Sequence, residues 1–170
     1  MGPLWLETFR HNRWANLRLL DSCASLTGDQ LQLGAPGTYG TVAATLQHLF
    51  AAEQRYVRQL GGGDALLSEA DEFPGVTVLK ELADGSGGAL LAIAASVNPD
   101  DTFEREFRDV LSRVSKGVVL IQALHHGNDH RAHIGTVLGQ NGLSTPPLDV
   151  WEYGLSMGFI TRLDPHTASG

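Results

Sequence analysis

The sequence predicts an all-α protein: a four-helix bundle with an additional short C-terminal helix. Three observations support this fold class. Apolar residues recur at steps of three and four over long segments, as on one face of an amphipathic helix. Breaks rich in glycine and proline separate these segments. Neither an internal repeat nor a linker between domains is visible, so we expect residues 1–170 to form a single domain, with a frayed tail over about 164–170.

Start and stop signals set the expected bounds of the helices. Pro3 suits the first turn of the first helix, and Gly28 ends that helix. Thr38 or Thr41 caps the second helix. The last helix follows the proline pair at 146–147. The expected helices span about 3–26, 41–60, 77–97, 115–140 and 148–163.

Two segments depart from the helical pattern. The third helix contains Gly85, Gly87 and Gly88, and each glycine costs about 1 kcal/mol relative to alanine inside a helix. Residues 102–107, Thr-Phe-Glu-Arg-Glu-Phe, alternate in character instead. We therefore expect a short strand or one arm of a β-hairpin between the third and fourth long helices.

Composition excludes several classes of function. The formal net charge is −7, and a chain without a basic cluster is a poor candidate for binding nucleic acid. It has no apolar run long enough to span a membrane and no recognisable targeting segment. The single cysteine, Cys23, cannot form an internal disulfide and fits a small buried apolar residue. We expect a cytoplasmic protein with no nucleic-acid or membrane partner.

A histidine cluster lies in the fourth long helix. Residues 125–133, His-His-Gly-Asn-Asp-His-Arg-Ala-His, hold four of the seven histidines of the chain. His126, His130 and His133 lie at i, i+4 and i+7 and therefore share one helix face. They continue a seam of core positions that includes Val119, Ala123 and Val137. A lone buried histidine is usually a hydrogen-bonded core residue, but three along one seam favour a metal site, because neutral imidazole binds zinc, nickel or iron well.

One helix does not easily supply three ligands to one ion. At a rise of about 1.5 Å per residue, His126 and His133 lie about 10 Å apart along the helix axis. The ligand pair is therefore either His126 with His130 or His130 with His133, and a third ligand comes from another helix. His48 and His11 are the candidates. His48 lies at the edge of the apolar stripe of its helix, whereas His11 has polar and charged neighbours typical of a surface residue.

The arrangement of these histidines resembles the DinB-like (DinB/YfiT) superfamily of bacterial metal-binding four-helix bundles. The resemblance lies in His48 within Leu-Gln-His-Leu-Phe-Ala-Ala-Glu at 46–53 and in His-Gly-Asn-Asp-His-Arg at 126–131. Residues 9–20 also resemble the first helix of that family. The resemblance covers nearly the whole chain, but only the three-histidine motif is specific. It implies that His48, His126 and His130 hold one divalent ion and leave positions open for water or substrate.

Two further residues are weaker candidates for a role in the chemistry. The family pattern usually continues His-Arg-Gly-Gln, whereas residues 130–133 read His-Arg-Ala-His. His133 could orient a ligand, shuttle protons or bind the ion itself. Glu53 follows His48 by five residues on the apolar stripe of the second helix. It could act as a general base or orient a ligand, or it could pair with an arginine such as Arg55, Arg58 or Arg131.

The resemblance also implies a type of chemistry, because relatives in the superfamily include enzymes that use low-molecular-weight thiols. We expect one divalent transition-metal ion (zinc, nickel, iron or manganese) that activates such a thiol, or a water, for attack on a small electrophile. A thiol S-transferase or a hydrolase would do this. The alternatives are a non-enzymatic, stress-associated bundle with a structural ion, and a metal-free core in which the histidines hydrogen-bond. By analogy with similar bundles we also expect a homodimer.

Overall fold

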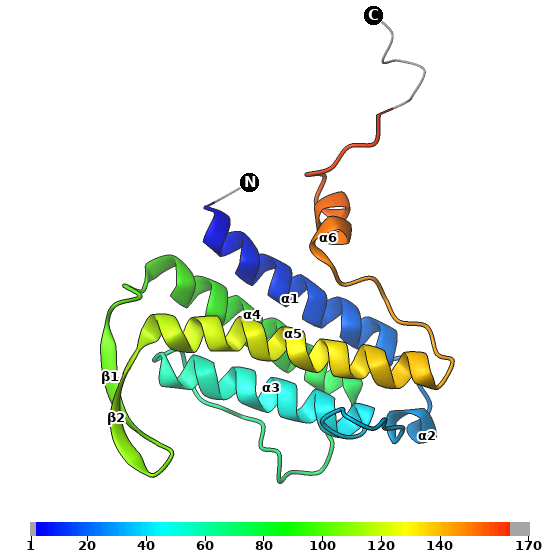
Figure 1. Ribbon diagram of the computed structural model, residues 1–170, viewed down its shortest axis with the longest axis horizontal. Helices are drawn as coiled ribbons and strands as arrows, with labels where there is room; N and C mark the ends of the chain where they lie inside the picture. Colours follow the sequence, from blue (N-terminus) through cyan, green and yellow to red (C-terminus); the bar gives the residue numbers. More distant parts are fainter. Residues whose placement is uncertain (1–2, 164–170) are drawn as a thin grey trace, which may run out of the picture.

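A computed structural model describes residues 3–163 and confirms a mostly helical protein with a small antiparallel sheet (Figure 1). The expected frayed tail at 164–170 lies outside the described residues. No helix within 3–163 is long and apolar enough to cross a membrane. The elements are α1 (Leu4–Cys23), α2 (Gly28–Leu31), α3 (Val42–Gln59), α4 (Val76–Ser96), β1 (Thr102–Phe107), β2 (Val110–Ser115), α5 (Lys116–Gln140) and α6 (Val150–Ser156).

The four long helices α1, α3, α4 and α5 lie side by side (Figure 1). Both α1 and α3 pack against α4 and α5, so each of the four has two neighbours among the others. Their apolar faces meet in two buried clusters. One cluster includes Leu20, Leu46, Leu79 and Ile134, and the other includes Phe9, Val57, Leu90 and Leu120. Each cluster contains residues from all four helices. This shared packing holds α3 against α5.

Side-chain caps explain where α3 and α5 begin. Thr41, not Thr38, caps α3, because its hydroxyl accepts a hydrogen bond from the backbone N–H of Ala44. Ser115 caps α5 by accepting from the backbone N–H of Val118. These caps agree with the expected ranges to within one or two residues.

Two expectations for the helices were wrong. The expected ranges contain no helix between 26 and 41, whereas Thr27 and Gln30 form a reciprocal capping box that supports the single turn of α2. The last helix is also much shorter than expected and ends at Ser156. Gly158 has a φ of 71°, and the chain turns back so that the N–H groups of the next two residues donate to the carbonyl of Gly154.

The alternating segment at 102–107 is a strand, as predicted. β1 pairs with β2 in an antiparallel hairpin, with Thr102 opposite Ser115 and Phe107 opposite Val110. Arg108 and Asp109 form the turn with φ values of 51° and 61°, as a two-residue hairpin turn of type I′ requires. The hairpin lies beside one end of the long helices (Figure 1).

The glycines at 85, 87 and 88 do not interrupt α4. At Gly87 the helix approaches α1 closely: an added Cβ would lie 2.8 Å from Cγ of Arg13. At Gly85 and Gly88 an added Cβ would meet no atom within 4 Å. Close packing therefore accounts for one of the three glycines.

Candidate metal site

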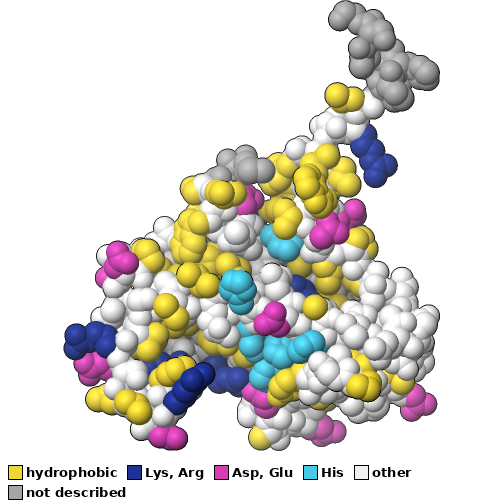
Figure 2. Space-filling view, viewed as in Figure 1, with side chains coloured by type: hydrophobic (Ala, Val, Ile, Leu, Met, Phe, Trp, Pro, Cys, Tyr) yellow, Lys and Arg dark blue, Asp and Glu magenta, His cyan; other side chains and the backbone are white. Residues whose placement is uncertain are grey.

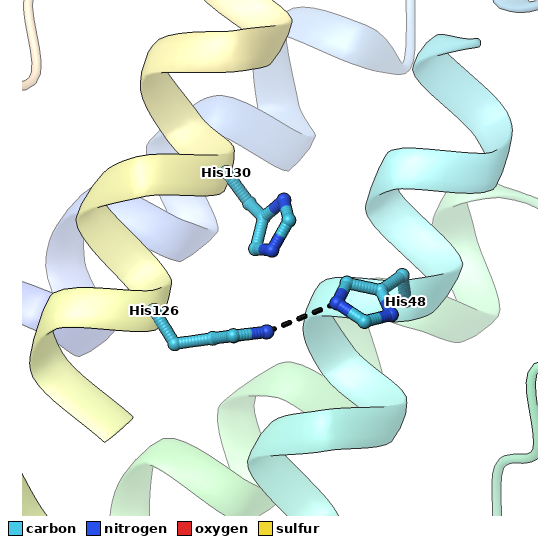
Figure 3. A group of neighbouring side chains, drawn as sticks. All are labelled: His48, His126 and His130. Carbon is cyan, nitrogen blue, oxygen red and sulfur yellow. Dashed lines mark hydrogen bonds between the residues drawn. The ribbon is translucent and has the colours of Figure 1, made fainter. Parts of the chain in front are cut away.

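Three histidines converge between α3 and α5. His48 projects from α3, and His126 and His130 project from successive turns of α5 (Figure 3). One ring nitrogen from each lies within 4.8 Å of the others, and the Nε2 atoms of His48 and His126 are 3.0 Å apart. Of the two ligand pairs that the sequence left open on α5, the structure brings His126 and His130 together with His48.

Burial and mutual proximity keep two of these rings neutral. Burial, followed by the neighbouring His130 and His48, lowers the pKa of His126 to about 4. Burial, followed by His48 and His133, lowers the pKa of His130 to about 4. At neutral pH both rings therefore retain a lone pair that can bind a metal ion.

Glu69 orients His48 from outside the histidine group. The Nδ1 atom of His48 lies 2.8 Å from Oε2 of Glu69, which also accepts from the Tyr39 hydroxyl at 3.0 Å. Arg55 pairs with Oε1 at 2.8 Å. Burial raises the pKa of Glu69, but the hydrogen bonds from His48, Arg55 and Tyr39 outweigh this effect and lower the pKa to about 2. A carboxylate at Nδ1 holds the proton there and leaves the Nε2 lone pair of His48 facing the other two histidines.

Sequence reasoning missed Glu69. It lies in the irregular segment between α3 and α4, where no periodic pattern assigns a side chain to a face. Its neighbours include two other acidic residues, Asp71 and Glu72, and nothing in the sequence distinguishes among the three. Only the folded position of this segment selects Glu69.

Aromatic rings border the histidine group. Tyr39 stacks on His48 with ring centroids 4.0 Å apart and meets His130 edge-on at 5.2 Å. Tyr56 meets His126 edge-on at 5.7 Å. Tyr39 is 46% exposed, so this border lies at the surface. Figure 2 shows a patch of histidine side chains on the same face, between α3 and α5.

The geometry and donor set of the three histidines fit a metal ion. Nitrogen ligands at 2.0–2.1 Å from a tetrahedral ion are about 3.3 Å apart, close to the 3.0 Å between His48 and His126. The Nδ1 atom of His130 is buried and has no hydrogen-bond partner within residues 3–163. Three neutral imidazoles suit zinc, nickel and iron. His48, His126 and His130 could therefore hold one metal ion.

His133 and His11 lie outside this close group. The ring of His133 packs edge-on against His130 at 5.3 Å, one turn further along α5. His11 is half-buried, not the surface residue that its neighbours suggested. Its Nε2 atom donates to the carbonyl of Leu148 at 2.8 Å, and its ring meets Tyr153 edge-on. His11 therefore fastens the segment before α6 to α1.

Glu53 belongs to a buried polar network that faces α1 and α4. Oε2 accepts from the side-chain amides of Asn12 and Asn16 at 3.2 and 2.9 Å, and Oε1 accepts from Ser86 at 2.5 Å. Arg131 donates to the oxygens of the same two asparagines at 2.8 and 2.6 Å. Burial raises the pKa of Glu53. This arrangement supports the interpretation that Glu53 pairs with Arg131, through two asparagine bridges.

Comparison with known proteins agrees with the geometry. The DinB family model matches residues 1–157. Among solved structures, the chain is similar to a DinB-like protein from Bacillus cereus at 18% identity and a TM-score of 0.65, covering 84% of this chain and 94% of that one. That likeness is one of fold. No curated protein matches the chain. The family match spans nearly all of the sequence and confirms the predicted resemblance: the chain belongs to the DinB family.

Proposed function

We propose that this protein is a metal-dependent enzyme built on a single four-helix-bundle domain. His48, His126 and His130 hold one divalent transition-metal ion: zinc, nickel, iron or manganese. The enzyme activates a low-molecular-weight thiol or a water for attack on a small electrophile, as a thiol S-transferase or hydrolase does. The observation that carries this proposal is the convergence of three imidazoles, one of them oriented by a carboxylate, at a partly exposed position.

The residues at this site have different roles. When bound, the ion supplies a positive charge that acidifies a thiol or water in an open position. Glu69 fixes the orientation of His48, and Arg55 and Tyr39 hold Glu69 in turn. The side chain of His48 retains 17% exposure, so a small molecule can approach the group from solvent.

The number of ligands favours catalysis over a purely structural ion. Structural zinc sites usually have four protein ligands, whereas catalytic sites keep three and leave a position open. The group found within residues 3–163 contains three. Two hydrophobic clusters also hold the four long helices together, and this apolar packing does not require a bound ion. The alternative is a non-enzymatic bundle with a structural ion, and the experiments below distinguish it from a metal-dependent enzyme.

Metal content tests the site itself. Protein purified without a histidine tag, reconstituted with each of the four metals and desalted, should retain one ion per chain by plasma mass spectrometry. His48→Ala, His126→Ala and His130→Ala should each lose it. His125→Ala is the matched control, since it removes an exposed imidazole of the same helix. Absence of stoichiometric metal in the wild type would overturn the proposal.

Turnover separates an enzyme from a metal-binding bundle. The metal-loaded protein is assayed with 1-chloro-2,4-dinitrobenzene and a panel of low-molecular-weight thiols, and with p-nitrophenyl acetate for hydrolysis. We expect turnover that requires metal, is abolished in His130→Ala and persists in His125→Ala. Stoichiometric metal without turnover of any probe would favour the non-enzymatic alternative.

A further inference from the structure

A cavity separate from the histidine group lies between α1, α5 and α6. Its volume is about 530 Å³, within the range of about 300–1,000 Å³ that is typical of small-molecule sites. None of the three converging histidines lines it. Hydrophobic side chains gather over α6 and the start of α1 in the upper part of Figure 2. The apolar walls are formed by Leu4, Leu124, Val150, Trp151, Phe159 and Ile160.

Specific contacts hold α6 in place as the outer wall of this cavity. The buried Tyr153 hydroxyl donates to Oε2 of Glu7 at 3.1 Å, and the Tyr153 ring packs edge-on against Trp14. Beyond α6 the chain folds back, and an added Cβ at Gly154 would lie 2.8 Å from Cδ1 of Ile160. The wall is therefore a packed part of the fold.

Most polar groups that line the cavity are already used within the protein. Glu7 is paired with Arg10 and accepts from Tyr153. Asn12 donates to Glu53 through its amide and accepts from Arg131 through its oxygen. These groups line the cavity but have few hydrogen-bonding atoms left for a ligand.

The α5 wall is different. Oδ1 of Asn128 accepts from Arg131 at 2.6 Å, which directs the Asn128 amide group away from the guanidinium. Within residues 3–163 neither the Asn128 amide nor the His125 ring has a hydrogen-bond partner, and both residues are exposed and line the cavity. This wall offers unused hydrogen-bond donors.

The α5 wall contains one charged side chain, Arg131. Arg131 carries a guanidinium, which is charged at neutral pH, and Asn12 and Asn16 connect it to its counter-charge, Glu53. Glu53 itself does not line the cavity, whereas Arg131 does. The acidic group that does line it, Glu7, has Arg10 as its counter-ion. The cavity thus combines apolar walls with a wall on α5 that offers hydrogen-bond donors and contains the Arg131 guanidinium.

We propose that this cavity is a second small-molecule site that binds aromatic acids. The flat apolar body lies between α1 and α6, and the carboxylate or sulfonate accepts hydrogen bonds from the Asn128 amide next to Arg131. The proposal is independent of metal binding, because the three histidines take no part in it.

Filling the cavity tests the site. The probe is 1-anilinonaphthalene-8-sulfonate, whose fluorescence is titrated with the metal-free full chain. We expect saturable binding of one probe per chain, weakened at least tenfold in Thr8→Trp, which places an indole in the cavity from an exposed position of α1. Thr136→Trp, at an exposed position of α5 outside the cavity, should bind as the wild type does. Equal affinities in all three proteins would overturn the proposal.

A charge variant tests the class of ligand. Asn128→Asp keeps an acceptor for Arg131 but replaces the amide donors with negative charge. Binding of the sulfonate probe should weaken about tenfold, whereas the neutral probe N-phenyl-1-naphthylamine should bind unchanged. Gln122→Glu adds the same charge at an exposed position of α5 outside the cavity and should alter neither. If Asn128→Asp weakens the binding of both probes equally, or of neither, the preference for acids is overturned.

Sedimentation velocity tests whether the cavity is an interface between copies of the chain. A wild-type dimer that Thr8→Trp dissociates would identify it as such an interface and overturn the small-molecule site.

Discussion

The Nδ1 atom of His48 lies 2.8 Å from Oε2 of Glu69, and the Nε2 atom of the same ring lies 3.0 Å from His126. One imidazole therefore connects a carboxylate on a loop to a histidine on another helix. A histidine bound on both sides in this way has a fixed tautomer and a fixed orientation.

Removing this carboxylate should weaken metal binding without removing a ligand. We expect Glu69→Ala to lower metal affinity about 10–100-fold, because His48 loses the partner that holds its proton at Nδ1. Competition against a chromogenic chelator measures the change. Glu72→Ala, an exposed acidic residue of the same loop, is the matched control. Unchanged affinity in Glu69→Ala would show that His48 needs no orienting partner.

Removing the metal should leave the fold intact. Each of the two hydrophobic clusters joins all four long helices by apolar contacts, so the metal-free protein should keep its helical circular dichroism and cooperative unfolding. Metal at 100 times its dissociation constant should add about 2.7 kcal/mol to the free energy of unfolding. Loss of helical structure on chelation would instead indicate a structural ion.

The stability of the metal-free protein should fall as the pH falls from about 6.5 towards 4. The pKa values of His126 and His130 are about 4 in the folded protein, below the ordinary value of 6.5. In this window the unfolded chain binds protons that the folded protein does not, so protonation favours unfolding. Urea unfolding at several pH values measures how steeply the free energy of unfolding changes with pH. This slope should be shallower in His126→Gln and His130→Gln. A slope equal to that of the wild type in both variants would contradict this account.

The buried network around Glu53 should show strong coupling. Arg131→Met should destabilise the fold by about 3–5 kcal/mol, because it leaves a buried carboxylate without its counter-charge. The double variant with Glu53→Gln should lose less than the sum of the two single variants. Urea unfolding of all four metal-free proteins gives the coupling energy. The exposed pair of Arg113 and Glu104 is the control, and Arg113→Met should change stability by less than about 1 kcal/mol. Additive effects of Glu53→Gln and Arg131→Met would contradict the network.

The glycines of α4 should respond differently to alanine. Gly88→Ala should stabilise the protein by up to about 1 kcal/mol, because alanine favours the helix and its Cβ meets open space. That gain corresponds to about 2–4 °C in melting temperature for a chain of this size. Gly87→Ala should give no such gain, since its Cβ would lie 2.8 Å from Cγ of Arg13. Calorimetry of the two variants checks the difference, and an equal gain in both would show that Arg13 moves aside freely.

The elements of the fold were largely predictable because their signals are local. Helical periodicity and caps such as Thr41 and Ser115 depend on residues within a few positions of one another, and so does the alternation in β1. The length of α6 was mispredicted because a turn after it, stabilised by hydrogen bonds to the carbonyl of Gly154, ends the helix before its apolar residues do.

The sequence by itself determined that His126 and His130 share a helix face, since a spacing of four residues does this in any α-helix. The family resemblance implied that His48 joins them. Only the tertiary structure decided which atom of His48 faces them, that Glu69 orients His48, and that Glu53 turns towards α1 and α4. Each of these relationships joins residues far apart in the chain. They depend on how whole helices and loops pack, and no local pattern of residues encodes that packing.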